Sequence, residues 1–189
     1  SILNTNHTDF EVIVVNDGST DNTKQILDSY LDSHLIVIHK VNEGVSVARN
    51  IGIKNATGDY VLLVDADDLL ENGALDYLSS YLQNANIDVL EYSVSSDTIS
   101  TNTISSNPIL YPNKIYNSIS EAIEISAERC FYCVWNKAYK RSFIQNKVYF
   151  PIGIVMGEDA IFNANVFLNN PKIASIDKIL YHHIQAGQA

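Results

Sequence analysis

The sequence is poor in cysteine, in basic residues and in long apolar runs. Its 189 residues include two cysteines, Cys130 and Cys133, too few for the disulfide framework of a small secreted domain. They have Cys-x-x-Cys spacing but no second pair, and we interpret them as two partly buried thiols. Apolar runs such as Val61–Val64 are far shorter than the roughly 20 residues of a membrane-spanning helix.

The shortage of basic residues restricts the partners that the chain can bind. Twelve Lys and Arg against 22 Asp and Glu give a net charge of −10 at pH 7, which argues against a general nucleic-acid-binding protein. An acidic chain can still bind an anionic ligand through a divalent cation. The hydrophobic content of 46% argues against intrinsic disorder. No signal peptide is predicted, and because residue 1 is Ser1 rather than Met, we expect the chain to be a fragment.

Apolar runs and helical repeats alternate along the first half of the chain. Strands are predicted at 11–15, 35–38, 60–64 and 87–90, and helices at 26–31, 44–52 and 75–82. This order is typical of parallel βαβ units, so the predicted fold class is α/β with a sheet covered on both faces. Ligands bind beyond the carboxyl ends of such strands. Two polar clusters, Asn16–Gly18 and Asp65–Asp68, follow strands in this way.

The composition changes after residue 92. Residues 93–107 are rich in Ser, Thr and Asn, which predicts an exposed loop or edge hairpin, with an acceptor-binding loop as the alternative. Further helices are predicted from 118 and over 157–168, and two short strands at 173–176 and 179–182. We predict one domain, 1–189, with a first half at 1–92 and a second half at 93–189.

Two acidic clusters carry the candidate chemistry. Asp65, Asp67 and Asp68 crowd three carboxylates at the end of a strand, which favours either Mg²⁺ or Mn²⁺ or a turn with helix-capping Asp residues. An EF-hand loop is excluded because its sixth position requires Gly, where this chain has Leu70. Glu158–Asp159 begins a predicted helix, where the helix dipole alone favours acidic residues and a catalytic role is the alternative.

Together these segments resemble family 2 glycosyltransferases of the GT-A fold, in the order of the family and over nearly the whole chain. The segments that carry the resemblance are Phe10–Asp21, Asn42–Gly44, Ala48–Gly52, Gly58–Asp68, Trp135–Lys137 and Gly157–Asp159. The resemblance implies a mostly parallel central sheet flanked by helices. The chain departs from the pattern by starting after the family's first strand, and by having Asn16 where Asp is usual.

On the nucleotide side, the resemblance implies that Asp17 hydrogen-bonds a uracil ring. Gly18, Arg49, Asp65 and Ala66 are implied neighbours of the nucleotide, although a structural salt bridge is the alternative for Arg49. A UDP-sugar is therefore the implied donor.

At the reacting atoms, Asp67, with Asp65 beside it, is the implied ligand of Mn²⁺ or Mg²⁺. Asp159 is the implied general base, and Glu158 either orients the site or caps the helix. Trp135 and His183 are candidate acceptor residues, for which a core aromatic and a packed histidine are the alternatives. His182–His183 is also a candidate for a late metal-binding histidine.

The implied activity is the inverting transfer of a sugar from a nucleotide-diphosphate sugar to an acceptor hydroxyl, in surface polysaccharide synthesis. The implied acceptor is a saccharide or a lipid-linked saccharide. The expected location is cytoplasmic, with peripheral association at the inner face of the membrane, and a homodimer is allowed. Two alternatives remain: a nucleotide-binding remnant without catalysis, and a phosphatase of the haloacid dehalogenase type, which would leave Asn16–Gly18 without a role. Without the first strand, residues 1–189 are expected to bind UDP weakly and to self-associate.

Overall fold

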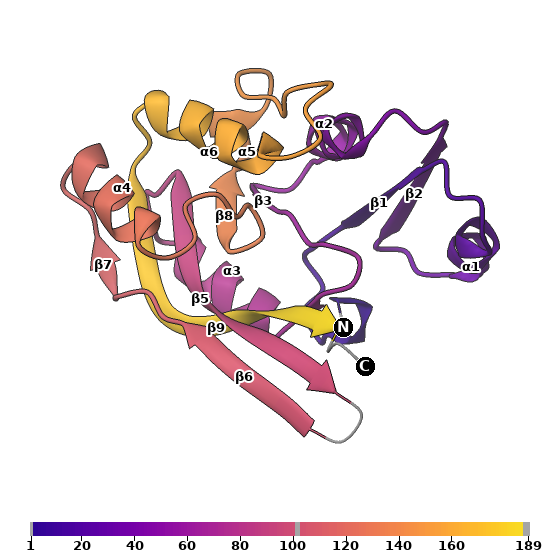
Figure 1. The fold of residues 1–189 in the computed structure, drawn as a ribbon, viewed down its shortest axis with the longest axis horizontal. Helices are drawn as coiled ribbons and strands as arrows, with labels where there is room; N and C mark the ends of the chain where they lie inside the picture. Colours follow the sequence, from indigo (N-terminus) through magenta and orange to yellow (C-terminus); the bar gives the residue numbers. More distant parts are fainter. Residues whose placement is uncertain (1, 101–102, 187–189) are drawn as a thin grey trace.

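The computed structural model describes residues 2–100 and 103–186, whose strands form two sheets (Figure 1). The small sheet pairs β1 (Val12–Asp17) in parallel with β2 (Leu35–Lys40). The seven-stranded sheet has the order β3-β8-β5-β9-β4, with β6 paired to β5 and β7 to β9. Its strands are β3 (Tyr60–Leu62), β4 (Leu69–Leu70), β5 (Val89–Ser100), β6 (Thr103–Ile109), β7 (Lys114–Ile115), β8 (Lys137–Lys140) and β9 (Ile173–Ala186).

Helices connect these strands, and the predicted α/β class is confirmed. The helices are the 3₁₀ turn η1 (Ile2–Asn4), α1 (Thr23–Ser29), α2 (Val45–Asn55), α3 (Ala74–Leu82), α4 (Ile119–Ala127), α5 (Arg141–Ile144) and α6 (Glu158–Leu168). In the small sheet, β1 carries a β-branched run that is only partly buried. The reason is that β1 pairs with β2 alone, while β3 pairs with β8 alone, so the described strands leave one edge of each unpaired. Figure 1 shows β1 on the side of the small sheet nearer to β3.

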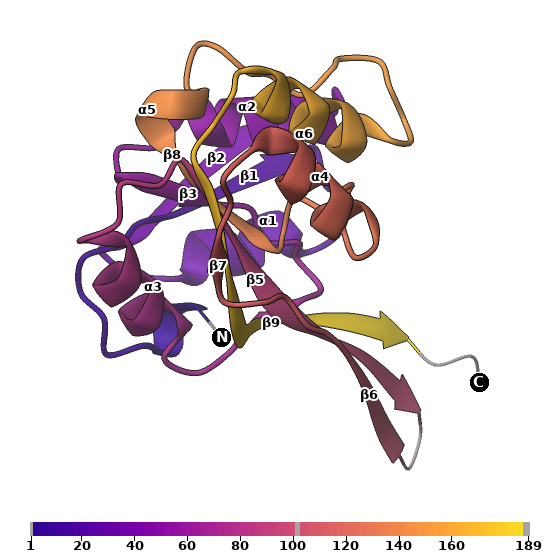
Figure 2. The ribbon, with the colours of Figure 1, turned by 90° about the vertical axis from the view of Figure 1, so that its left-hand side faces the viewer.

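The seven-stranded sheet is less parallel than predicted. Its pairs are antiparallel except β5 with β9, because β5 and β6 form a hairpin and β8 runs against both of its neighbours. The hairpin prediction for 93–107 is confirmed over the described residues, and 101–102 lie outside them. The hairpin projects from the body of the molecule (Figure 2). The prediction of two strands at 173–176 and 179–182 is wrong, since β9 resumes its pairing with β5 after a register shift at Tyr92–Ser93.

The large sheet has a hydrophobic core on each face. Side chains alternate along β5, so that Leu90 and Tyr92 pack in the core with α3 while Val89 packs in the core with α6. The two views agree that α3 lies on the opposite side of the sheet from α4 and α6 (Figures 1 and 2). Because β5 crosses residue 92 without a break, the change of composition there is not a boundary in the fold.

Local sequence signals set the starts of the helices of the second half. In α4, the N-cap Ser118 hydroxyl accepts a hydrogen bond from the Glu121 amide, and the Glu121 carboxylate accepts one from the amide of Asn117, one residue before the N-cap, in a variant of the capping box. In α6, Gly157 precedes the helix with φ of 87°, and Glu158 and Asp159 occupy the first turn. Two carboxylates therefore lie at the start of α6.

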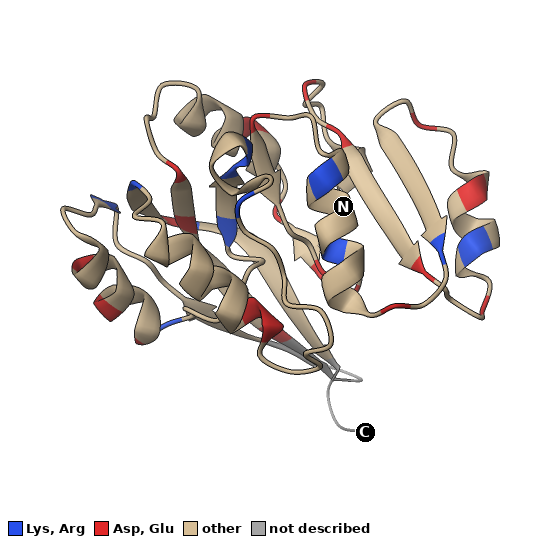
Figure 3. Cartoon of the chain, turned by 90° about the horizontal axis from the view of Figure 1, so that it is seen from above, with Lys and Arg blue, Asp and Glu red and all other residues tan. Residues whose placement is uncertain are grey.

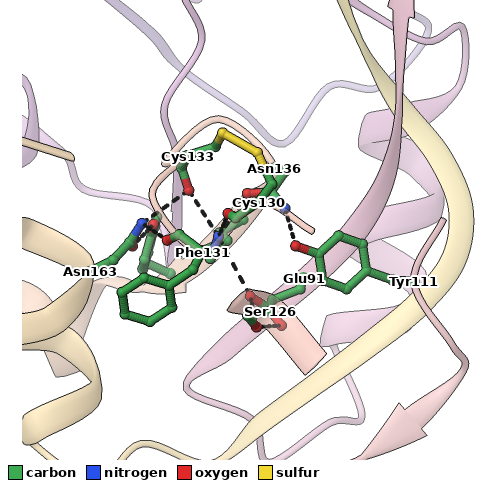
Figure 4. Close-up of a disulfide and its surroundings, with 10 residues drawn as sticks. Glu91, Tyr111, Ser126, Cys130, Phe131, Cys133, Asn136 and Asn163 are labelled. Carbon is green, nitrogen blue, oxygen red and sulfur yellow. Dashed lines mark hydrogen bonds and ion pairs between the residues drawn. A yellow bond between two sulfur atoms is a disulfide. The ribbon is translucent and has the colours of Figure 1, made fainter. Parts of the chain in front are cut away.

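The prediction of two free thiols is wrong, because Cys130 and Cys133 form a disulfide (Figure 4). The loop between α4 and β8 brings their Cα atoms to 5.3 Å, within the range that a disulfide requires. The bond closes a four-residue loop that contains Phe131 and Tyr132.

Candidate active site

Asp17 ends β1 and joins it to the loop after β2. Its Oδ1 accepts hydrogen bonds from Lys40 Nζ and the Glu43 amide (3.0 Å), and its Oδ2 accepts one from the Gly44 amide (2.8 Å). Burial alone would raise the pKa of Asp17, but these donors outweigh it and lower the pKa. Asp17 is thus held as a carboxylate at the carboxyl edge of the small sheet.

The residues on either side of Asp17 are equally constrained. Gly18 has φ of 76°, and a Cβ there would lie 2.6 Å from the Asn42 backbone nitrogen, so only glycine fits. Asn16 is buried, and its side chain accepts from the Ser19 amide (2.9 Å) and bonds to His39 Nδ1 (3.1 Å). The amide of Asn16 therefore fits its own surroundings, although the resemblance predicts Asp at this position.

Arg49, on α2, brings together carboxylates from two distant segments. Its Nη1 donates to Glu158 Oε1 (3.1 Å) and Asp159 Oδ1 (2.5 Å), and its Nη2 donates to Asp65 Oδ1 (3.1 Å). The guanidinium also lies over the Phe150 ring, 5.2 Å from its centroid. Arg49 thus joins the segment after β3 to the start of α6.

The surroundings of Asp159 alter its affinity for protons. Burial raises the pKa of Asp159 to about 6, an effect that Arg49 opposes and that the neighbouring Glu158 and Asp65 reinforce. A carboxylate with a pKa near the working pH is suited to accept a proton and to release it again. The geometry and the pKa therefore agree with the role of a base.

The three acidic residues after β3 have different surroundings. Asp68 is buried, where its carboxylate accepts from the Tyr181 hydroxyl (2.6 Å) and the Ile184 amide (2.7 Å), so it anchors β9. Asp65 is partly exposed and pairs with Arg49, whereas Ala66 and Asp67 are exposed, and the Asp67 carboxylate makes no hydrogen bond or ion pair among the described residues.

The metal-binding prediction can be compared with this donor set. In the described part of the chain, no three His, Cys, Asp or Glu side chains are arranged to hold a metal ion by themselves. Mg²⁺ is commonly held by one or two carboxylates together with phosphate oxygens. Asp65 and Asp67 fit that arrangement, in which a nucleotide diphosphate completes the ligands.

The tentative acceptor residues lie in packed surroundings. Trp135 is 9% exposed, and its ring stacks with those of Tyr181 and His183, at centroid distances of 5.0 and 5.3 Å. His182 bonds to two carboxylates, with Nε2 2.6 Å from Glu71 Oε2 and Nδ1 2.8 Å from Asp97 Oδ2. The role of these residues toward an acceptor stays a prediction.

A hollow lies beside Asp159 that the sequence did not indicate. A cavity of about 590 Å³ is lined by Tyr132, Val155, Met156, Gly157, Glu158, Asp159 and Ala160. The side chains of Tyr132, Val155 and Met156 are largely exposed at this surface. The only signal in the sequence was an aromatic pair between two cysteines, which does not distinguish an exposed ring from a core ring.

Comparison with known proteins identifies the family. The model of glycosyl transferase family 2 matches residues 1–167, and the chain belongs to this family. An uncharacterized glycosyltransferase, EpsJ of Bacillus subtilis, is 31% identical over 96% of this chain and 54% of its own length. Glycosyltransferase GlyA of Streptococcus pneumoniae is 32% identical over 99% of this chain and 28% of its own length. The chain therefore spans about half the length, or less, of these curated relatives.

Solved structures confirm the GT-A fold. The structure of Staphylococcus aureus TarS 1–349 in complex with UDP-GlcNAc is 25% identical, with a TM-score of 0.77 over 98% of this chain and 53% of that chain. The curated sequence of S. aureus TarS, a poly(ribitol-phosphate) β-N-acetylglucosaminyltransferase, is 26% identical over 93% of this chain and 30% of its own length. Family membership decides against the phosphatase alternative. Among the described helices, none has the length and apolar character needed to cross a bilayer.

Proposed function

We propose that this chain is the catalytic part of an inverting glycosyltransferase that uses a UDP-sugar donor. The observation that carries the proposal is the Arg49 cluster, which joins Asp65 to Glu158 and Asp159 beside an open cavity. The similarity to a TarS structure holding UDP-GlcNAc supports UDP-GlcNAc as the first donor to test.

Asp17 is proposed to recognise the uracil base. Its oxygens accept three hydrogen bonds from the protein, and a carboxylate offers about four acceptor positions. One position therefore remains for the N–H of uracil. Because Lys40 and two amides fix the carboxylate, it is preorganised for that bond.

In the transfer step, Asp159 takes the proton of the acceptor hydroxyl as the oxygen attacks the anomeric carbon. The bond from the anomeric carbon to the diphosphate oxygen breaks, and UDP leaves from the opposite face, so the configuration inverts. Arg49 positions Asp159 through Oδ1 and links it to Asp65. Asp65 and Asp67 would hold Mn²⁺ or Mg²⁺, which when bound offsets the negative charge developing on the diphosphate.

The first prediction tests Asp159. Asp159→Asn keeps the shape of the side chain and removes its basicity, so transfer should fall by about 10²-fold or more while UDP affinity stays near that of the wild type. The wild-type rate should also fall as the pH drops below about 6, because protonation removes the base. Rates are measured as UDP release and acceptor glycosylation over pH 5–8.

Two outcomes would contradict this assignment. Unchanged turnover in Asp159→Asn would exclude it as the base, and Glu158→Gln would be tested next. UDP binding without turnover in the wild type, at the natural length of the protein, would favour the non-catalytic remnant.

The second prediction tests the metal ligands. Asp67→Ala should weaken Mn²⁺-dependent UDP binding, because Asp67 is exposed at the end of the β3 segment and bonded to no other described residue. UDP is titrated by calorimetry with and without Mn²⁺. Glu124→Ala, an exposed carboxylate on α4, is the control and should bind like the wild type. If Asp67→Ala retains the full effect of Mn²⁺, Asp67 is not the ligand.

The family resemblance extends the proposal to surface polysaccharide synthesis, with a saccharide or lipid-linked acceptor. Peripheral membrane association and a homodimer remain predictions. Co-sedimentation with vesicles and analytical ultracentrifugation would test them.

A further inference from the structure

We infer that Tyr132 is the platform on which the acceptor sugar stacks, and that this acceptor is an uncharged saccharide ring rather than a polyol phosphate. The inference rests on the proposed transferase function, and it concerns the cavity beside Asp159. The role of Tyr132 is inferred from the exposure, support and charge of the groups around the cavity. It is separate from the expected roles of Trp135 and His183.

Position is the first argument. Tyr132 lines the same cavity as Asp159, and its side chain is 58% exposed. An acceptor hydroxyl must approach the base closely for proton transfer, so the rest of the acceptor has to occupy this hollow. An exposed aromatic face next to carboxylates suits a sugar ring, which offers C–H groups on one face and hydroxyl donors at its edge.

Hydrogen bonds hold the backbone of the disulfide loop, 130–133, both before and after Tyr132. Buried Lys137 donates to the carbonyls of Cys130 (3.0 Å) and Cys133 (2.8 Å). Asn163, on α6, donates to the carbonyls of Phe131 (2.7 Å) and Cys133 (3.0 Å), and Figure 4 shows Asn163 facing the disulfide loop.

Ring packing and a buried ion pair also support the disulfide loop, 130–133. The Phe131 ring packs edge-on against Phe167 of α6. Glu91, fully buried on β5, lies 3.5 Å from Lys137 and accepts from the Ser126 hydroxyl. Because this backbone is already fixed, a ligand that stacks on Tyr132 restricts only the rotamers of that side chain, which limits the entropy lost on binding.

Charge decides which acceptor fits. The ionisable groups that line the cavity are Glu158, Asp159 and the Tyr132 phenol, and none of the lining residues is basic. Of the cations near Asp159, Arg49 is engaged by three carboxylates, and buried Lys137 is engaged by two backbone carbonyls and Glu91. Acidic residues lie on both the small-sheet part and the larger part of the molecule, and the chain carries −10 in total (Figure 3). A phosphate-bearing acceptor would meet repulsion without a partner here, whereas a neutral ring would not.

The test uses the protein at its natural length with UDP present, and follows binding by saturation-transfer NMR, which does not require turnover. The neutral probe is methyl β-D-glucopyranoside and the anionic probe is ribitol 5-phosphate. The wild type should bind the neutral probe. Tyr132→Ala should weaken this binding by about tenfold or more, while Tyr132→Trp should retain it. UDP affinity should be unchanged in both variants.

Tyr30→Ala is the matched control. Tyr30 is the same residue type with a similar exposure of 56%, and it follows α1 at the far end of the molecule (Figure 1). It should bind both the neutral probe and UDP like the wild type.

A gain of binding tests the charge argument separately. Val155 is 94% exposed and lines the cavity, so Val155→Lys adds a cation with little effect on the core. Val155→Lys should improve binding of ribitol 5-phosphate by roughly threefold, whereas Val155→Gln should not.

Three results would overturn the inference: equal binding of the neutral probe in Tyr132→Ala and the wild type, preference of the wild type for ribitol 5-phosphate, or no binding of the neutral probe at all. These results are distinct from failure of the proposed function, which would appear as absence of UDP binding and of UDP-sugar turnover.

Discussion

At the scale of the residue, backbone geometry around Gly18 holds two loops of the donor side against each other. The approach to Asn42 and the positive φ act together at this position. We expect Gly18→Ala to lower the free energy of unfolding by about 1–3 kcal/mol and to weaken UDP binding, since the Asn42 backbone would have to move. Urea unfolding and UDP titration measure the two effects.

A substitution at Gly153 separates the cost of the positive φ from the cost of the close approach to Asn42. It has φ of 81°, but a Cβ there would meet nothing within 4 Å. Gly153→Ala should therefore show only the cost of the backbone conformation, and UDP binding should be unchanged. Equal losses of stability in both variants would mean that the contact with Asn42 contributes nothing.

Residue identity alone could not assign the three Asp residues after β3. Asp65, Asp67 and Asp68 are the same residue type within one turn, yet one pairs with Arg49, one is exposed and one is buried on Tyr181. Their partners make this difference, since Arg49 of α2 lies 16 positions before Asp65 and Tyr181 of β9 lies 113 positions after Asp68. The Arg49 alternatives, nucleotide neighbour and salt bridge, were left open for the same reason.

At the scale of the element, the most accurate sequence predictions were those with a strong local period. The β-branched run of β1 and the acidic start of α6 appear where they were expected. The predictions failed where pairing with strands distant in the sequence sets the length or direction of a strand, as in the unbroken β9 and the antiparallel β8. The oxidation of Cys130 and Cys133 also depends on loop geometry that spacing does not reveal.

His182 ties β9 to β5 and to Glu71, and this link should depend on pH. Burial alone would lower the pKa of His182, but hydrogen bonds to Glu71 and Asp97 outweigh it and raise the pKa. A histidine whose folded pKa is raised contributes stability that is complete below its unfolded pKa of about 6.5 and is lost as the pH rises through the folded value. The melting temperature should therefore fall more between pH 6 and pH 8.5 in the wild type than in His182→Gln.

The two carboxylates that bond to His182, Glu71 and Asp97, also titrate. The pKa values of Glu71 and Asp97 are lowered by partners that include His182, so these groups lose their stabilising effect only in acid, outside this window. His183→Gln is the control, because His183 has no ion pair among the described residues. It should keep the wild-type pH dependence, and a matching loss in both variants would exclude His182 as the source.

At the scale of the whole molecule, the separation of the two sheets is the main feature. Among the described strands, β1 and β3 each have one unpaired edge, and the apolar side chains of both are only partly buried. A further strand between them would satisfy backbone groups on two sides and cover this apolar surface. We expect residues 1–189 to self-associate through these edges. Sedimentation velocity at increasing protein concentration would show this, and a single species of constant mass would contradict it.

The Cys130–Cys133 pair can exist as a disulfide or as two thiols, and the redox state of the compartment determines which form is present. Glutathione and thioredoxin keep most cytosolic thiols reduced, whereas oxidising compartments preserve disulfides. The cytoplasmic location expected from the family resemblance would therefore favour the dithiol form, in which Cys130 and Cys133 are no longer joined. Since the bond lies within one short loop, its reduction leaves both sheets connected as before. The same sequence made in two compartments would then share one fold and differ in how firmly Tyr132 is held.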